Sequence, residues 1–301
     1  SQINVTRFLR YIIIVAAGIL PAATVCSQDT LDNKVKNRKI GLYSAAVYGV
    51  GLVGLNALWY SDYERSGLHS FNDNQEWLQV DKVGHVYSTF TLSKLSYDLY
   101  SHRDEKSRNQ ALLYSSISSF AFLTTVEVFD GFSKEWGFSW GDFAANTSGI
   151  ALFAAQEYFL KRQVVQLKYS FYPTKYSDLR PNVLGSSLLE KAFKDYNGQT
   201  YWASINLNLI HSSIKPKWLS IAFGLGADEM IFADQIRSSF NGNVYDAKRQ
   251  YYLSLDVDWE QIETNKVWLK WVFKVANCVK VPAPSLEFKK GKTVQFRTVY
   301  F

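Results

Sequence analysis

Two hydrophobic patterns follow one another along the chain and change near residue 165. In the first part, apolar and polar residues recur at helical spacing over three stretches. These run from about Leu78 to Tyr100, from Ser107 to Val128 and from Gly141 to Gln163. The uncharged run Ile40–Tyr60 precedes them as a further candidate. The pattern therefore predicts an N-terminal bundle of about four helices.

From Gln166 onward the hydrophobic period shortens to two, which is typical of β-strands. The alternation is clearest at Tyr201–His211, Trp218–Gly226, Tyr251–Trp259 and Val294–Phe301. Val267–Val275 fits a strand or an amphipathic helix, and lysines spaced by four residues favour the helix. Pro282 and Pro284 should then break the chain. So few strands cannot close a membrane barrel of at least about eight. We therefore expect an α+β fold, with a C-terminal antiparallel β-rich region packed on the helices.

The N-terminal residues have the composition of a secretory signal. Arg7 and Arg10 precede a short apolar run, and small residues follow up to Ser27. The run is too short to span a bilayer, which takes roughly 20 residues. Cleavage before Gln28 fits the pattern, and acylation of Cys26 as a lipoprotein is the alternative. In either case we expect export, to the periplasm or the outer membrane of a Gram-negative bacterium.

The chain then divides into a signal segment (1–27), a helical domain (28–165) and a β-rich region (166–301). Within the helical domain, Ile40–Tyr60 has the length and composition of a transmembrane helix. The basic run Lys34–Lys39 lies just before it, on the side that export would place outside. This contradicts the positive-inside bias of inner-membrane proteins. We therefore expect a buried central helix, or one that lies against the inner face of the outer membrane.

Charge and cysteine content exclude several classes of protein. The net charge of +6 is spread along the chain, whereas a nucleic-acid binder would cluster it. Cys26 and Cys278 form no CxxC pattern, which excludes zinc ribbons and thioredoxin-like chemistry. Aromatic residues make up 16% of the chain and suit a membrane interface or pleated strands. The expected partners are therefore a membrane or outer-membrane proteins, and no nucleic acid.

Polar residues interrupt the three later helices at spacings that place them on shared helix faces. They are Asp81, Lys82 and His85 on the first helix, Glu127 and Asp130 at the end of the second, and Asp142 and Asn146 at the start of the third. Ionisable groups on apolar helices are costly unless they face one another. We therefore expect one shared cluster near the helix ends, with the loop 129–140 over it.

One histidine among carboxylates can support acid–base catalysis or hold a divalent metal. The catalytic candidates are His85, Glu127 and Asp142, and Asp130 joins them as a candidate metal ligand. The same groups can instead form an inert network, in which Lys82 and His85 neutralise Glu127 and Asp142. That structural cluster would comprise Asp81, Lys82, His85, Glu127, Asp142 and Asn146. No metalloprotease, esterase or nucleotide-binding motif is present in the sequence, so the cofactor and any small-molecule ligand stay open.

Three sequence blocks around these residues resemble a known family. The blocks are Asp81–His85, Glu127–Ser133 and Phe138–Asn146. Together they resemble domain-of-unknown-function family 2279, whose members are described as predicted periplasmic lipoproteins. They are similar, more distantly, to the VanZ-like membrane proteins. The resemblance covers about residues 36–165, and it implies an envelope location without an established activity.

Three functions are compatible with this sequence. The favoured one is a non-enzymatic envelope protein, structural or partner-binding, in which the polar cluster is a scaffold. The second is an enzyme that modifies lipid or cell wall through His85, Glu127 and Asp142, with or without a divalent metal. The third is a polar-ligand-binding module in which a strand face with Asn206 and Asn208 lines a groove.

Overall fold

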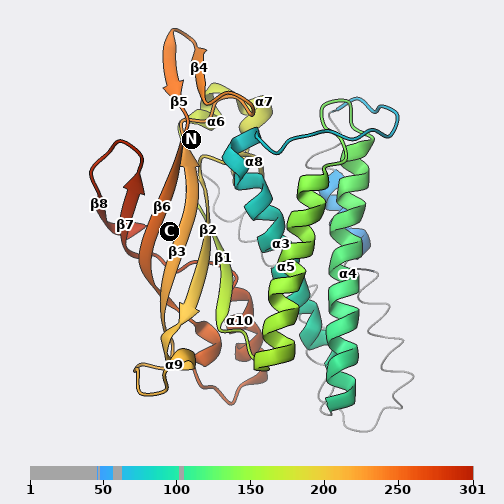
Figure 1. Cartoon of the computed structure of the whole chain (residues 1–301), viewed down its shortest axis with the longest axis vertical. Helices are drawn as coiled ribbons and strands as arrows, with labels where there is room; N and C mark the ends of the chain where they lie inside the picture. Colours follow the sequence, from blue (N-terminus) through green and yellow to red (C-terminus); the bar gives the residue numbers. More distant parts are fainter. Residues whose placement is uncertain (1–45, 47, 57–62, 102–104, 301) are drawn as a thin grey trace.

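A computed structural model describes residues 46, 48–56, 63–101 and 105–300 of the chain (Figure 1). The expected signal segment, Cys26 and both ends of the Ile40–Tyr60 run lie outside these residues. Long helices occupy the first half of the described chain, and an antiparallel sheet dominates the second. The expected α+β fold is therefore confirmed.

Three long helices make up most of the first half of the described chain. They are α3 (Val80–Tyr100), α4 (Glu105–Gly131) and α5 (Trp140–Ala155). A short 3-10 turn, η2 (Glu76–Gln79), leads into α3, and a π-helical turn, η3 (Gln156–Leu160), extends α5. The helices begin and end within a few residues of the stretches that the hydrophobic spacing predicts. Helix α3 lies between the sheet and the other two helices, and contacts both (Figure 1).

The contact between α3 and α5 is close because α5 has a glycine there. A Cβ atom at Gly149 would overlap the Thr89 hydroxyl and the Val86 carbonyl of α3. One turn further along, Phe90 and Phe153 pack edge to face across the same two helices. The start of α5 is thereby held against the first turns of α3, which fixes how side chains on the two helices face each other.

The described part of the Ile40–Tyr60 run is helical from Tyr48 to Leu55 and lies against α4. The Tyr48 ring packs on Phe122, and its hydroxyl is hydrogen-bonded to Thr125. Val50 and Val53 are exposed. For this part, the expectation of a buried central helix is wrong, because α3 already fills the centre and this segment covers only the outer side of α4.

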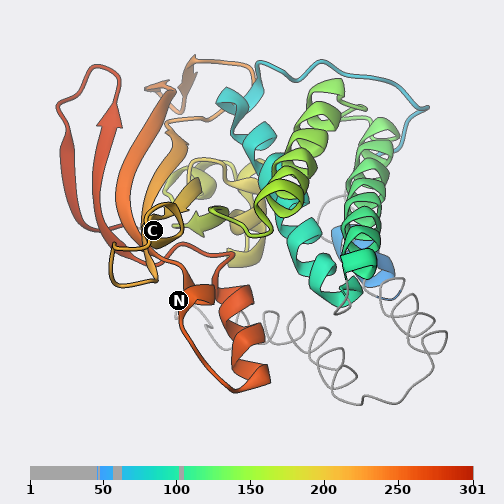
Figure 2. The same cartoon turned by 60° about the horizontal axis from the view of Figure 1, so that its bottom comes forward.

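The main sheet has six antiparallel strands and forms a curved layer beside the helices (Figure 2). In spatial order they are β1 (Val165–Phe171), β2 (Gln199–Asn206), β3 (Leu219–Asp228), β6 (Lys248–Val257), β7 (Ala283–Lys289) and β8 (Gln295–Tyr300). Strands β4 (Arg237–Phe240) and β5 (Asn243–Asp246) form a separate hairpin. Short helices connect the strands: α6 (Tyr176–Leu179), α7 (Pro181–Leu184), α8 (Leu188–Lys194), α9 (Leu207–Ile210), η4 (Trp259–Gln261) and α10 (Val267–Ala276).

Several boundaries differ from those that the alternation predicts. Strand β2 ends at Asn206, whose side chain accepts a hydrogen bond from Leu209 N and so starts helix α9. Pro284 lies inside β7 and does not break it, and the register against β8 shifts between Ala283 and Ser285. Proline has no N–H to donate to a neighbouring strand. It is therefore tolerated inside a strand where the pairing is irregular, as it is here. Val267–Ala276 is a helix, as the lysine spacing favours.

The two faces of the sheet have opposite polarity, and the polar face is the buried one. Lys168 and Asp256 form an ion pair of 2.8 Å with both side chains 0% exposed. Ser204 donates a hydrogen bond to Asp256, and the Lys280 ammonium lies over the Trp202 ring. On the opposite face, alternate residues are apolar. There Tyr169 and Tyr201 pack against Tyr87 of α3, which joins the two halves of the chain.

One described helix has the length and composition of a membrane span. It is the stretch Arg108–Gly131 of α4, and most of this stretch is not buried inside the protein. The exposed side chains include Leu113, Tyr114 and Ile117.

Candidate functional site

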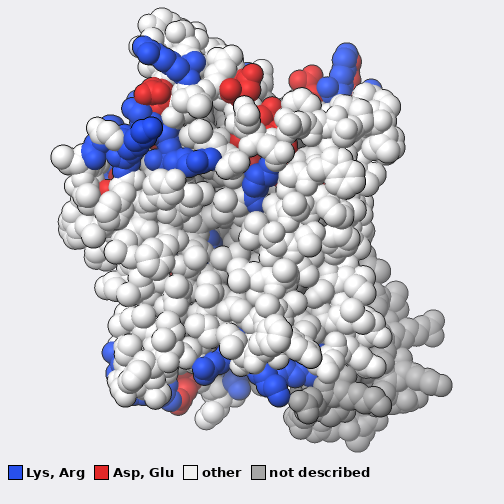
Figure 3. Space-filling model, in the orientation of Figure 1, with Lys and Arg blue, Asp and Glu red and all other residues white. Residues whose placement is uncertain are grey.

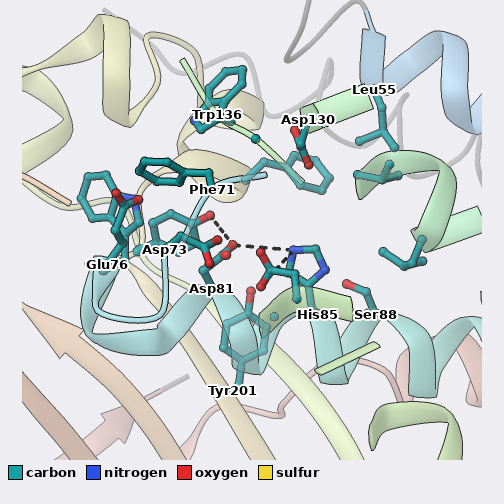
Figure 4. Close-up of a pocket in the computed structure, with 18 residues that line it drawn as sticks. Leu55, Phe71, Asp73, Glu76, Asp81, His85, Ser88, Asp130, Trp136 and Tyr201 are labelled. Carbon is teal, nitrogen blue, oxygen red and sulfur yellow. Dashed lines mark hydrogen bonds and ion pairs between the residues drawn. The ribbon is translucent and has the colours of Figure 1, made fainter. Parts of the chain in front are cut away.

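The start of α3, the end of α4 and the start of α5 lie at one end of the bundle (Figure 1), where Asp81 and His85 line a cavity (Figure 4). The first turns of α3 supply Asp81, Lys82 and His85, the end of α4 supplies Glu127, and the start of α5 supplies Asp142 and Asn146. The Ser139 hydroxyl caps α5 by accepting a hydrogen bond from Asp142 N, which fixes the first turn. Residues 46 positions apart in sequence, Asp81 and Glu127, thus contribute to one cluster around His85.

The His85 ring is held from one side only. Its Nδ1–H donates a hydrogen bond of 3.1 Å to Asn146 Oδ1 on α5, and Glu127 Oε1 on α4 lies within ion-pair distance at 3.3 Å. Glu127 is 1% exposed, which places this contact in the interior. The other ring nitrogen, Nε2, lies 3.9 Å from Asp81 Oδ1 and 3.9 Å from Asp142 Oδ1. Both oxygens are too far from Nε2 for a direct hydrogen bond.

Lys82 neutralises part of the carboxylate charge. Its ammonium lies 2.7 Å from Asp73 Oδ2, 2.8 Å from Asp142 Oδ1 and 3.6 Å from Asp81 Oδ2. Asp73 comes from the loop before α3 and also accepts a hydrogen bond of 2.6 Å from Ser139. Burial acts to raise the pKa of Asp73, but its hydrogen bonds with Asp142, Lys82 and Ser139 outweigh burial and lower that pKa.

Two tyrosines from the second half of the chain complete the cluster. The Tyr196 hydroxyl donates a hydrogen bond of 2.6 Å to Asp81 Oδ1. The Tyr201 ring rises from β2 to Gly84 of α3, where a Cβ atom would stand 2.7 Å from the tyrosine oxygen. Gly84 is thus required for the close approach of Tyr201, and the sheet positions one wall of the site.

The cluster faces a cavity of about 210 Å³. Five lining residues are carboxylic acids, namely Asp73, Glu76, Asp81, Asp130 and Asp142. Aromatic side chains form much of the remaining wall, among them Phe71, Trp77 and Trp136 (Figure 4). Burial, with the nearby carboxylates of Asp73 and Asp234, raises the pKa of Glu76. The cavity therefore combines an acidic floor with apolar walls.

Three of these groups are close enough to share one ion. One ligand atom each from Asp81, His85 and Asp142 lies within 4.8 Å of the others. The Nδ2 atom of Asn146 is buried without a hydrogen-bond partner among the described residues. Asp130 lines the same cavity but does not belong to this close group. Glu127 contacts His85 through Nδ1, so it supports the ring from behind.

The sequence reasoning missed Asp73, Tyr196 and Tyr201. Asp73 lies in the loop Asn72–Asn74, whose composition indicates only a turn. The two tyrosines follow α5 by more than 35 residues and belong to the β-rich half, so helix periodicity carries no information about them. Two other residues singled out from the sequence lie elsewhere. Asn206 is buried against Asp258, and Asn208 belongs to α9.

Comparison with known proteins shows that the helical part is similar to a recognised sequence family. Residues 67–158 match the family model DUF2279, described as a predicted periplasmic lipoprotein. The match includes every cluster residue from Asp73 to Asn146 and leaves Tyr196 and Tyr201 outside. No curated protein and no solved structure matches the chain. The expected family resemblance is thereby confirmed, and the family description supports an exported protein of the cell envelope.

Proposed function

We propose that this envelope protein binds a divalent metal ion through Asp81, His85 and Asp142 and uses it on a polar group of an envelope lipid or glycan. The observation that carries the proposal is the orientation of His85. Its Nδ1 is held by Asn146 and Glu127, and Nε2 faces two carboxylate oxygens at 3.9 Å each. A metal-binding histidine typically donates its other ring N–H to such a partner, which fixes the ring and its tautomer.

The distances suit an ion better than a direct contact. A metal ion that lies about 2.0–2.2 Å from each donor atom leaves neighbouring donor atoms roughly 3–4 Å apart. His85 Nε2 lies 3.9 Å from each carboxylate oxygen, the three donor atoms lie within 4.8 Å of one another, and the three residues line a cavity. An inert network would be expected to bring Nε2 within hydrogen-bond distance of one carboxylate. The ion pairs of the structural cluster expected from the sequence, Lys82 with Asp142 and His85 with Glu127, are also present. The metal site accounts in addition for Nε2 and the two carboxylates that it faces across the cavity.

Charge favours a cation at the same place. Five carboxylic acids line the cavity, and the Lys82 ammonium contacts three of them, Asp73, Asp81 and Asp142. An anionic substrate alone would be repelled by this floor, whereas a divalent cation would be attracted. A bound ion would polarise a phosphoryl or carbonyl oxygen and activate a water molecule. The aromatic walls then offer apolar surface beside the reacting group, as in many small-molecule sites.

The third function considered from the sequence, a groove lined by Asn206 and Asn208, loses its basis. The Asn206 amide donates to Asp258 and to the Lys217 carbonyl on the buried face of the sheet. Asn208 donates to backbone carbonyls of the turn after α9. The two side chains therefore share no strand face that a ligand could contact.

The proposal is tested by titrating the full chain, purified in detergent and stripped with a chelator, with Zn²⁺ or Mn²⁺ in a calorimeter. We expect saturable binding of one ion per chain. His85→Ala and Asp81→Asn should each weaken binding by about tenfold or more, because each removes one ligand. His211→Ala is the matched control, since His211 lies beyond α9 at the opposite end of the molecule (Figure 1).

The control variant should bind as tightly as the wild type. Absence of saturable binding by the folded wild type would overturn the proposal, and the cluster would then be an internal ion-pair network. Equal affinity in wild type and His85→Ala would overturn it as well. Thermal unfolding of each variant shows whether a lost site reflects a lost fold.

A further inference from the structure

The distribution of apolar surface indicates where in the envelope the chain resides. In a soluble protein, a sheet with one polar and one apolar face buries the apolar one. Here the opposite holds over β3, β6 and β7. The buried face carries the Lys168–Asp256 ion pair, whereas Phe223 and Leu255 on the other face are each 52% exposed. Phe288 of β7 extends the exposed apolar face.

Helix α4 exposes a second apolar surface on the other side of the molecule. Ile117, near the middle of the helix, is 56% exposed, and Leu113 and Tyr114 beside it are exposed as well. Val53 of the short helix next to α4 adds to the same surface. On soluble monomers, exposed apolar side chains are normally scattered singly, whereas here they gather on one sheet face and one long helix. We name this surface, over the sheet face and α4, the apolar belt.

Charged side chains lie beyond the belt on two opposite ends. Figure 3 shows a broad uncharged band across sheet and helices, with lysines, arginines and carboxylates gathered above and below it. The exposed ion pair Lys248–Asp246 marks the end with the β4–β5 hairpin, and Lys217–Glu263 marks the end with α9 (Figure 1). A docking patch for another protein would be bounded by polar residues on all sides. On the face that Figure 3 shows, the uncharged band with charged residues gathered at its two ends matches the profile of a bilayer.

The ends of α5 give the thickness of the band. Trp140 at its first residue is exposed, and so are Tyr158 and Phe159 in the turn that extends it. At 1.5 Å per residue, 18 residues separate Trp140 from Tyr158 by about 27 Å. Hydrocarbon layers of membranes are about 25–30 Å thick, and tryptophan and tyrosine concentrate at their two boundaries. The net charge of +6 also suits anionic headgroups next to these boundaries.

We propose that the apolar belt is inserted in the hydrocarbon layer of a lipid bilayer. The exposed sheet face and α4 then contact acyl chains, and the polar face of the sheet is shielded from lipid inside the protein. This goes beyond attachment through an acylated cysteine, which would tether a water-soluble domain. It is also independent of the metal site, because no residue of the belt belongs to the cluster around His85.

The test places a fluorescent probe at two isoleucines of similar exposure. Ile117→Cys lies in the belt, and Ile236→Cys lies beside the β4–β5 hairpin, where Ile236 is 64% exposed. Both are made in a Cys26→Ser, Cys278→Ala background, which removes the native thiols and any lipid attached at Cys26. The full chain is labelled with an environment-sensitive dye and reconstituted into vesicles of phosphatidylcholine and phosphatidylglycerol. Brominated acyl chains serve as the quencher.

We expect the probe at residue 117 to be quenched about twofold or more, and the probe at residue 236 to be unaffected. The protein should also stay with the vesicles during extraction with alkaline carbonate. Three results would overturn the proposal. They are equal quenching at both positions, release by carbonate, and a monodisperse protein or self-associated oligomer that stays in solution without detergent. Circular dichroism of each labelled variant verifies that the fold is retained.

Discussion

The contact between α3 and α5 allows a direct test of how the site is positioned. Gly149 faces α3 so closely that a Cβ atom would stand 3.0 Å from the Val86 carbonyl carbon and nearer still to its oxygen. Ordinary van der Waals contact is 3.4–4 Å. Gly149→Ala therefore forces the two helices apart by about half an ångström or more, and overpacking of this kind costs about 1–3 kcal/mol.

The matched control is the same substitution at a glycine with open surroundings. A Cβ atom at Gly49, also in a helix, would meet no atom within 4 Å. Alanine restricts the unfolded chain and favours the helix, so Gly49→Ala should raise the free energy of unfolding by about 0.5–1 kcal/mol. The two variants thus differ in sign, although the chemical change is identical.

The assay is unfolding of the full chain in detergent micelles, followed by circular dichroism. Gly149→Ala should lower the free energy of unfolding, and it should also weaken metal binding, because His85 and Asp142 lie on the two helices that separate. Unchanged stability of Gly149→Ala would refute the close packing of α3 and α5. A loss of stability in Gly49→Ala as large as that in Gly149→Ala would refute the reasoning from local space.

Two further substitutions probe the buried polar groups. Lys168→Met leaves Asp256 without its closest cationic partner on the buried sheet face and should lower the free energy of unfolding by about 3 kcal/mol. Lys217→Met, at an exposed ion pair, should change it by less than about 1 kcal/mol, and similar losses for both would contradict the buried pairing. Asn146→Leu removes the acceptor for His85 Nδ1 and should weaken metal binding about tenfold or more in calorimetry, with the one-ion stoichiometry retained. Wild-type affinity in Asn146→Leu would show that this contact does not orient the ring.

Helix periodicity alone predicted part of the site. Asp81 and His85, four residues apart, had to share a face of one helix, and Asp142 and Asn146 a face of another. Buried charges are costly without partners, and this cost alone predicts that the two polar helix faces meet. Asp73 could not be found in this way, because a loop has no period. Tyr196 could not be found either, because its hydrogen bond to Asp81 joins residues that are 115 positions apart in the chain.

The sheet shows a different limit of the sequence. Alternation reveals that a strand has two unlike faces, but it does not say which face is buried. The inverted polarity becomes visible only when Lys168 and Asp256 are seen paired in the interior, with Phe223 outside. The end of β2 was missed for a local reason, since the Asn206 side chain caps a short helix where the apolar alternation continues.

The metal site is tested most directly by locating an ion. Crystals of the protein soaked with Zn²⁺ or Mn²⁺ would be measured at the absorption edge of the metal. We expect one strong anomalous peak about 2.0–2.2 Å from His85 Nε2 and from one carboxylate oxygen each of Asp81 and Asp142. The absence of a peak there, at metal concentrations that saturate the protein in solution, would contradict the account. A peak on the Nδ1 side of His85 would contradict it equally.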